Sequence, residues 1–592
     1  MDTTQKKLAE LRKVMKSQKI DAVIIPSNDP HQSEYVSPHW QERAWISGFT
    51  GSAGLVIVTH DHAGLWTDSR YFIQAEMELA NSGFTLHKMY NQFGSPHIEY
   101  LLETLPAGSS VAVNGFMFSK QSIDGLQNAL SKKKIGLVYQ KDLISMIWKD
   151  RPENSLSPIF IHSETFTGQS INEKLRVIRN KIKMAGGDAL FLSTLDDIAW
   201  SFNIRGNDVE YNPVAIAYAV IDKTSAHLFI DARKVTRDVK GYFTKAKVKL
   251  HPYEELLQFL SSMGSDQTLL VDESTISQSV YDAIQCKVKY HPSIPKWEKA
   301  IKTNVEIQHL RNTMRKDGAA LAHTFHWIEK SLKQKKSINE CDVADKLAEY
   351  RSQQEHYFGE SFAAIVGYQS NGAIVHYHAH RDTCKTILPK GILLVDSGGQ
   401  YFDGTTDITR TFTLSKPKKK HKISYTSILK GMICVARTKF PKGTTGIQLD
   451  TLARQFLWSH GLNYLHGTGH GVGYFLNVHE PPQGIAPSFA ERGKTVHEVG
   501  MLTSDEPGYY EDGAYGMRIE NLIVAKASEY KGFLEFETLT LYPFEKKLID
   551  KKLLSCDEKH WINAYHDECY QRISPYLKGE VKSWFKKKCK KI

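Results

Sequence analysis

The stretch from residue 361 to residue 526 constrains the fold most, because it places charged side chains inside glycine-rich segments that otherwise have the pattern of strands. The apolar run GILLV ends in Asp396, and a glycine-rich turn separates it from Asp407 at the start of a second strand. If these strands pair antiparallel, the two carboxylates can converge, and they then need a cation between them. Asp beside Gly is also an ordinary turn residue, so this pair alone leaves both interpretations open.

A second segment, HGTGHGVG, contains His466 and His470. Its alternate glycines disfavour a helix by about 1 kcal/mol each. In extended chain the even spacing keeps both imidazoles on one side, and the glycines allow the backbone to approach a ligand closely. The alternative is a flexible loop in which the histidines are incidental.

A third pair of segments, DEPGYY and GMRIENLIV, adds two glutamates. The second segment predicts a strand over 516–524 in which Arg518 and Glu520 share a face with an apolar core residue. A glutamate buried in this way must be paired or bind a metal. Glu506 stands before Pro-Gly and could equally be a turn carboxylate.

Taken together, these segments supply four carboxylates and one imidazole, in the chain order Asp396, Asp407, His470, Glu506 and Glu520. This is a hard ligand set, which suits Mn²⁺, Co²⁺ or Fe²⁺ at least as well as Zn²⁺ and argues against a structural thiolate site. So many carboxylates exceed what one small ion needs. Two metal ions that share bridging carboxylates are the natural solution.

The residues before this stretch predict a duplicated α/β domain. A helical pattern followed by a buried strand at 21–26 recurs as a helical pattern followed by a strand at 188–193. An Asp-x-Arg element ends a later strand of each series, at Asp68 and at Asp231. Two unrelated α/β domains with similar local patterns are the alternative to a duplication.

The third part of the chain begins with helical periodicity near residue 296, followed by a second helix expected over 317–332. An amphipathic helical tail is expected over 552–585. The expected domains are therefore 1–152, 153–297 and 298–592, with a helical C-terminal extension from about 530.

Composition narrows the classes of partner. The formal net charge is +11, but much of the excess comes from basic runs at 416–422 and 586–591, which are typical of solvated loops and tails, so nucleic acid is not expected as a partner. The 7 cysteines are scattered without a Cys-x-x-Cys pair, which fits a reducing compartment. A polar N-terminus and the lack of a long apolar run predict a cytoplasmic protein with no membrane partner.

The motifs between 361 and 526 resemble those of the pita-bread-fold metallopeptidases, which include methionine aminopeptidase, prolidase, aminopeptidase P and the metal-free creatinase. With two α/β domains before the catalytic one and a helical extension after it, the chain resembles the long, three-domain form of aminopeptidase P. The resemblance implies a fold of two creatinase-like α/β domains followed by an α+β pita-bread catalytic domain.

The resemblance also implies roles for the five ligands. Asp396 would bind one metal ion, His470 and Glu506 the other, and Asp407 and Glu520 would bridge them. The ions are expected to be Mn²⁺, with Zn²⁺ or Co²⁺ as alternatives. A water activated between them would be the nucleophile, and Glu506 would also accept its proton.

Further side chains match substrate-binding positions of the family. In HYHAH, His376, His378 and His380 alternate as on one face of a strand. His376 would contact the substrate, while His378 and His380 would be structural or face solvent.

His479 matches the histidine that stabilises the tetrahedral intermediate. His466 would line the prolyl pocket. Tyr510 and Arg518 match positions that hold ligands or substrate in place, with a plain salt bridge as the alternative for Arg518.

The expected function is hydrolysis of the N-terminal Xaa-Pro bond of peptides by a metalloaminopeptidase. The first alternative is a prolidase restricted to Xaa-Pro dipeptides, which the three-domain length disfavours. The second is a pita-bread binding protein without catalysis, which the five intact ligand positions disfavour. A homodimer is expected from the resemblance alone.

Overall fold

The computed structural model describes residues 3–90, 95–487 and 489–592, and contacts within the chain divide it into two compact units. Unit 1 comprises Met1–His162 and Gln169–Pro295, and unit 2 comprises Ser163–Gly168 and Lys296–Ile592. Among the helices of the described residues, none combines the length and the apolar character that crossing a membrane would require. The two units are described separately below.

The described residues of unit 1 form two larger sheets with the same topology, of orders β4-β3-β2-β1-β5-β6 and β12-β11-β10-β8-β13-β14. The first contains β1 (Ala22–Ile25), β2 (Leu55–Thr59), β3 (Ala63–Asp68), β4 (Thr85–Met89), β5 (Ser110–Ala112) and β6 (Gly136–Val138). The second contains β8 (Ala189–Leu192), β10 (Tyr218–Asp222), β11 (Ala226–Phe229), β12 (Val248–His251), β13 (Thr268–Val271) and β14 (Lys287–Tyr290).

Corresponding strand pairs of the two sheets also have the same relative directions: β1 and β2, like β8 and β10, are antiparallel, whereas β1 and β5, like β8 and β13, are parallel. An amphipathic helix precedes the first strand of each sheet, α1 (Thr3–Ser17) and α7 (Ile171–Met184). The Asp-x-Arg elements form the same local ion pair in both, since Arg70 Nε lies 2.8 Å from Asp68 Oδ1 and Arg233 Nε lies 3.0 Å from Asp231 Oδ1. The expected pair of α/β folds is confirmed, whereas the domain borders stay predictions.

Unit 2 begins with one long helix where the sequence predicted two. After the short α12 (Ile294–Ala300), α13 runs without interruption over Asn304–Lys333 and starts at a capping box between Thr303 and Glu306. The expected break near residue 317 was wrong. Asp317 lies on the buried face of α13, and its carboxylate accepts a hydrogen bond from Arg351 Nε at 2.8 Å, so a polar residue in this helix marks an interior ion pair rather than a helix end.

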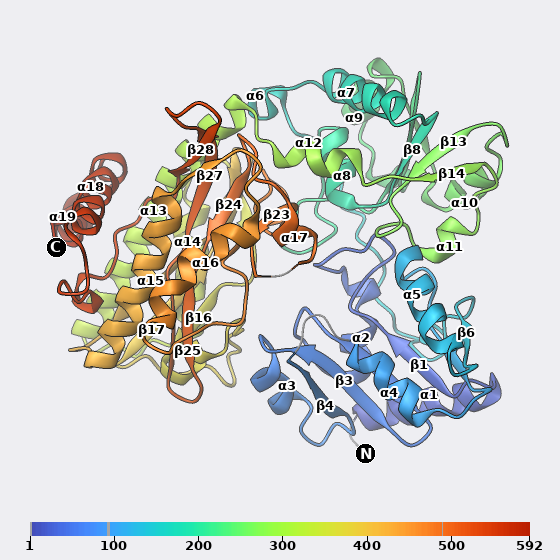
Figure 1. Ribbon diagram of the computed structural model, residues 1–592, viewed down its shortest axis with the longest axis horizontal. Helices are drawn as coiled ribbons and strands as arrows, with labels where there is room; N and C mark the ends of the chain where they lie inside the picture. The colour runs from blue at the N-terminus through green and yellow to red at the C-terminus, as the bar shows by residue number, and fades with distance from the viewer. Residues whose placement is uncertain (1–2, 91–94, 488) are drawn as a thin grey trace. The chain divides into compact units, whose positions relative to one another are not determined.

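Unit 2 combines helices with strands that pair antiparallel (Figure 1). Its described sheets have the orders β15-β18-β19, β16-β17-β20, β21-β28-β27-β24-β22-β23 and β25-β26. The bounds are β15 Tyr357–Glu360, β16 Ile365–Tyr368, β17 Ile392–Ser397, β18 Gly399–Tyr401, β19 Gly404–Thr405, β20 Ile408–Thr413, β21 Lys439–Pro441, β22 Gly469–Gly471, β23 Glu480–Ile485, β24 Leu502–Asp505, β25 Gly508–Glu511, β26 Tyr515–Arg518, β27 Asn521–Ala527 and β28 Phe533–Thr538.

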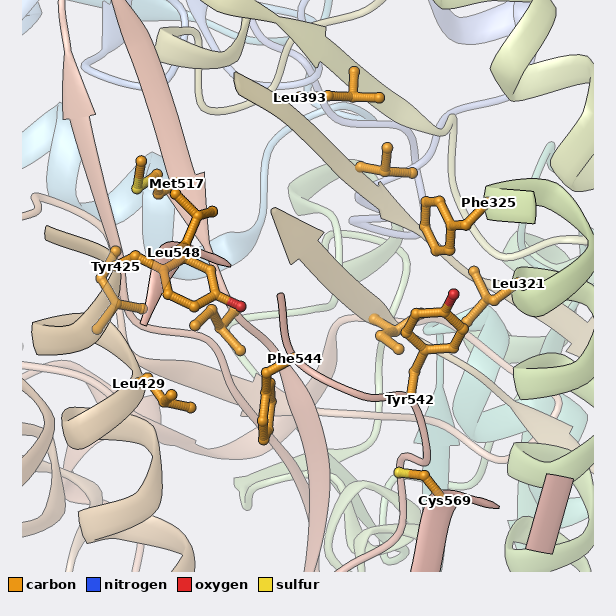
Figure 2. Packing of buried hydrophobic residues seen from close by; sticks show 14 of the residues in the cluster. Leu321, Phe325, Leu393, Tyr425, Leu429, Met517, Tyr542, Phe544, Leu548 and Cys569 are labelled. Carbon is orange, nitrogen blue, oxygen red and sulfur yellow. The ribbon is translucent and has the colours of Figure 1, made fainter. Parts of the chain in front are cut away.

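Helices cover these strands and bury the main core of unit 2. Figure 1 shows α13, α14 (Glu340–Ser352), α15 (Lys419–Arg437) and α16 (Gly446–Trp458) beside the strands. Figure 2 shows side chains from α13, α15 and the segment after β28 meeting in one apolar cluster, among them Phe325, Leu429 and Phe544. The expected helical extension forms α18 (Cys556–Ile573) and α19 (Gly579–Lys588), which join this core through Cys569 and Phe585.

Candidate active site

Two paired strands bring the first two predicted ligands together. Strands β17 and β20 are antiparallel, with Asp396 opposite Thr409 in the register, and Asp407 directly precedes β20. Because neighbouring strands lie about 4.8 Å apart, both carboxylates reach the same end of this pair. The predicted antiparallel pairing is confirmed.

His470 extends the cluster from another sheet. It is the central residue of β22, and both flanking glycines are required by close backbone contacts: a Cβ at Gly469 would lie 1.8 Å from the carbonyl oxygen of Ser504, and one at Gly471 would lie 2.3 Å from that of Glu480. The His470 Nδ1–H donates to the Gly471 carbonyl at 2.9 Å. This bond fixes the tautomer whose unprotonated Nε2 is available as a ligand atom.

The carboxylates converge on this Nε2. Ligand atoms of Asp407, His470 and Glu520 all lie within 4.8 Å of one another, and all three residues are buried. His470 Nε2 lies 3.5 Å from Asp407 Oδ2 and 3.5 Å from Glu506 Oε1. Asp396 joins the group through Arg518, whose Nη2 forms an ion pair with Asp396 Oδ2. The structure thus brings all five predicted ligand residues into one cluster.

Glu520 reaches the cluster by a route that differs from the prediction. The expected continuous strand over 516–524 is wrong: β26 ends at Arg518, and β27 begins at Asn521 in a different sheet. Glu520 lies in the break, where its N–H donates to the Thr409 carbonyl at 3.1 Å. The chain changes sheets here because the break is fastened to β20 rather than to either neighbouring strand.

Thr409 is a residue that the sequence interpretation missed. Its hydroxyl donates to Glu520 Oε2 at 2.9 Å and accepts from Arg518 Nε at 3.1 Å, so it orients two of the charged groups at once. The available signal was its position two residues after Asp407 in a strand, since such residues share a face. Ser504 has a comparable place, because its hydroxyl accepts from the His470 N–H at 3.0 Å and donates to Glu506 Oε1 at 3.4 Å.

The electrostatics of the cluster call for a cation. Asp396, Asp407 and Glu520 are 6%, 4% and 1% exposed. Burial, followed by the charges of neighbouring carboxylates, raises the pKa of Asp407 and of Glu520 well above the usual range. Burial also raises the pKa of Glu506, against the opposing effect of Arg518.

A divalent metal fits these donors. Within the described residues, Asp396 Oδ1 is buried without a hydrogen-bond partner, which is costly for a carboxylate oxygen unless an ion occupies the position. The four carboxylates outnumber the guanidinium of Arg518, so the cluster is negative when ionised. Oxygen donors with one imidazole suit Mn²⁺, Co²⁺, Fe²⁺ or Zn²⁺.

The predicted substrate-binding residues border this cluster at several points. The rings of His479 and His470 meet edge to face with centroids 4.4 Å apart. His466 Nε2 lies 2.9 Å from the Tyr510 hydroxyl, which also accepts a hydrogen bond from Arg518 Nη1. His466 lies outside β22, so it and His470 do not share a strand face as the spacing suggested.

His376 also differs from the prediction in its local structure. The expected strand over 374–380 is wrong, because the chain turns after the short 3₁₀ helix η4 (Gln369–Ala373) and the Tyr377 N–H donates to the Ile374 carbonyl at 3.1 Å. His376 lies in this turn and is half-buried. His378 and His380 are exposed, and their rings contact each other with centroids 4.7 Å apart.

Comparison with known families matches nearly every part of the chain. The profile described as metallopeptidase family M24 matches residues 308–527, and the C-terminal region of this peptidase family matches 532–592. The creatinase/prolidase N-terminal domain matches twice, over 7–145 and 150–306.

Full-length relatives agree with this match. Aminopeptidase P2 of Arabidopsis thaliana is 41% identical over 602 residues, which cover 95% of this chain and 84% of that protein. A probable Xaa-Pro aminopeptidase P of Paracoccidioides brasiliensis (strain Pb03) is 40% identical over 617 residues, covering 100% of both.

Solved structures show the same architecture. X-prolyl aminopeptidase from Caenorhabditis elegans, described as a cytosolic enzyme with a di-nuclear active site, has a TM-score of 0.95 at 32% identity and covers 100% of both chains. The Xaa-Pro dipeptidase from Bacillus anthracis has a TM-score of 0.52 at 26% identity and covers 64% of this chain. The clustered ligands and these matches together place the chain in the metallopeptidase family M24.

Proposed function

We propose that the chain is a metalloaminopeptidase that hydrolyses the bond between an N-terminal residue and a proline in the second position. The observation that carries this proposal is the cluster in which ligand atoms of Asp407, His470 and Glu520 lie within 4.8 Å of one another. The full-length similarity to Xaa-Pro aminopeptidases favours this substrate class over that of the shorter dipeptidases.

In the proposed site, Asp396 would hold one divalent ion, His470 and Glu506 would hold a second, and Asp407 and Glu520 would be shared between the two. Mn²⁺ is the ion we propose, and Zn²⁺ or Co²⁺ would suit the same donors. When bound, the two ions would supply a water nucleophile at neutral pH and a Lewis acid for the peptide carbonyl.

The chain's own groups complete the reaction. Glu506 is the proposed proton acceptor, because its Oε1 lies 3.5 Å from His470 Nε2 in the cluster while its side chain stays 18% exposed. It would return the proton to the leaving proline nitrogen. His479, packed against His470, is the proposed donor to the developing oxyanion.

Recognition of proline follows from its chemistry. An Xaa-Pro bond is a tertiary amide without an N–H, so the site must grip the pyrrolidine ring by its shape. His466 and Tyr510, joined by a 2.9 Å hydrogen bond, are the proposed walls of that pocket. His376 is proposed to contact the substrate, and Arg518 to hold Asp396 and Tyr510 in place.

The partners proposed for the chain are short peptides with proline in the second position, rather than nucleic acid or a membrane. We also propose that it acts in the cytoplasm as a homodimer. The description of the nematode enzyme as cytosolic supports the first part.

A matched set of peptides tests the substrate class. The Mn²⁺-loaded protein is expected to release arginine from Arg-Pro-Pro at least about tenfold faster than from the dipeptide Arg-Pro, and not from Arg-Ala-Pro, as measured by chromatography of the products. A preference for Arg-Pro would instead support a prolidase. Folded, metal-loaded protein that cleaves none of them would support a binding protein without catalysis.

A further inference from the structure

Glu340, the first residue of α14, is a buried carboxylate whose partners lie in one segment of the chain. Its exposed fraction is 0%. Its two oxygens accept hydrogen bonds from the Tyr368 N–H (2.7 Å), Asn371 Nδ2 (2.9 and 3.0 Å), the Tyr377 hydroxyl (2.8 Å) and the Lys385 N–H (2.7 Å). These bonds offset the cost of burying the charge.

The position of Glu340 at the start of a helix further stabilises its buried charge. Asn339 and Asp342 form a capping box, so Glu340 lies within the first turn of α14. Unpaired N–H groups and the helix dipole at this end favour a negative charge. Glu340 is therefore held on one side by its own helix and bound on the other side by the loop.

The partners of Glu340 frame the loop that contains His376. We define the 369–385 loop as the chain that follows β16 and includes η4. The bonds from Tyr368 and Lys385 close its two ends, and those from Asn371 and Tyr377 fasten its interior. One carboxylate thus binds the loop at both ends and at two points of its interior.

The loop in turn contacts the catalytic cluster. A Cβ at Gly516 of β26 would lie 1.7 Å from the Gly372 carbonyl oxygen, so η4 and β26 are packed backbone to backbone. Further along, the Val375 carbonyl accepts a hydrogen bond from Arg518 Nη2 at 3.5 Å. Arg518 is the residue that pairs with Asp396.

We infer that Glu340 is a positioning residue for the reaction: its carboxylate sets the 369–385 loop so that His376 is presented to the substrate. This inference rests on the proposed function, because it assumes that His376 contacts substrate. Among the described residues, the side-chain hydrogen bonds of Glu340 go to the loop and its edges rather than to the proposed metal ligands, so the inferred role is exerted through the loop.

The chain offers a matched control. Arg381, in the same loop, forms ion pairs with Asp342 and Asp345 of the same helix. Their side chains are 58%, 33% and 66% exposed, and exposed pairs contribute little to holding a loop. Glu340→Gln and Arg381→Gln therefore each weaken a link between this loop and α14, one buried and one exposed.

The experiment compares wild type, Glu340→Gln and Arg381→Gln as full-length, Mn²⁺-loaded proteins. Hydrogen exchange is followed by mass spectrometry over 374–384, with 425–436 in α15 as the reference segment, and KM and kcat are measured with Arg-Pro-Pro. In Glu340→Gln we expect exchange of the loop amides to be about tenfold faster, with the reference unchanged. We expect KM to rise about tenfold with a smaller change in kcat, whereas Arg381→Gln stays within about twofold of wild type.

The inference would be overturned if both the hydrogen exchange of the loop and the KM of Glu340→Gln matched wild type. It would also be overturned if exchange became faster by the same factor in the reference segment, since Glu340 would then stabilise unit 2 as a whole rather than the loop. If Glu340→Gln does not fold, Tyr377→Phe decides: it removes one donor and must show both changes at about two- to fivefold, and unchanged values would overturn the inference. Wild-type protein that fails to cleave Arg-Pro-Pro would instead overturn the proposed function, while the exchange data still report whether Glu340 holds the loop.

Discussion

Asp407→Asn is expected to lower kcat/KM for Arg-Pro-Pro by about 10³-fold, equivalent to about 4 kcal/mol of transition-state stabilisation. Asp407 lies 3.5 Å from His470 Nε2 and shares the cluster with Glu520, so the variant removes a proposed bridging ligand. The metal content, measured by atomic absorption, should fall below two ions per chain.

The stability of the metal-free variant shows whether activity is lost through the missing ligand or through unfolding. Burial and neighbouring carboxylates raise the pKa of Asp407, so the metal-free native state holds this proton more tightly than the unfolded state, and stability is lost as the pH rises and the buried carboxyl must ionise. Metal-free Asp407→Asn should therefore melt at or above the temperature of metal-free wild type. Asp512→Asn, which removes the same charge from an exposed turn, should match wild type in activity and metal content. Full activity in Asp407→Asn would contradict the ligand assignment.

Arg518→Met is expected to have the opposite effect on the metal-free protein. Arg518 is 2% exposed and its guanidinium contacts Asp396, Tyr510 and Thr409, so its loss leaves a buried carboxylate unpaired. Breaking a buried pair costs about 3–5 kcal/mol, and the melting temperature should fall by roughly 5–10 °C. The kcat/KM should fall about 10²-fold because the ligand and pocket residues lose their orientation.

Two further variants show why Arg518→Met loses stability and activity. Arg518→Lys keeps the charge but lacks the planar fork that reaches three partners, so it should restore only part of the stability and of kcat/KM. Arg572→Met removes an exposed pair with Glu568 and should change neither quantity measurably. If Arg518→Lys behaved as wild type, charge alone would explain the residue, and the plain salt bridge would replace the proposed orienting role.

The residues that we propose as ligands could be singled out from the sequence because their chemistry conflicts with their surroundings. Asp396 ends an apolar strand, and Glu520 lies among apolar residues, where an unpaired carboxylate would be too costly. The duplicated sheets of unit 1 could also be predicted, since helix and strand periods recur in the same order. In both cases the prediction depends on which residues are buried, and the order of apolar and polar residues in the sequence indicates this directly.

The two strand predictions that were wrong concern segments whose structure depends on contacts with residues distant in sequence. The strand predicted around His376 becomes a turn because Glu340 and Arg518 bind the loop from other elements. The strand through Glu520 breaks because its backbone bonds to Thr409 in another sheet. The alternation of polar and apolar residues carries no information about such bonds. Strand prediction from this alternation therefore fails where the segments around the site are irregular.

Removal and return of the metal is the most direct test of whether this chain is a metal-dependent Xaa-Pro aminopeptidase. Protein stripped with a chelator should lose hydrolysis of Arg-Pro-Pro, and activity should return with added Mn²⁺ in proportion to bound metal, reaching its maximum at two ions per chain. Stripped protein that contains no residual metal and still releases arginine at the original rate would contradict the account.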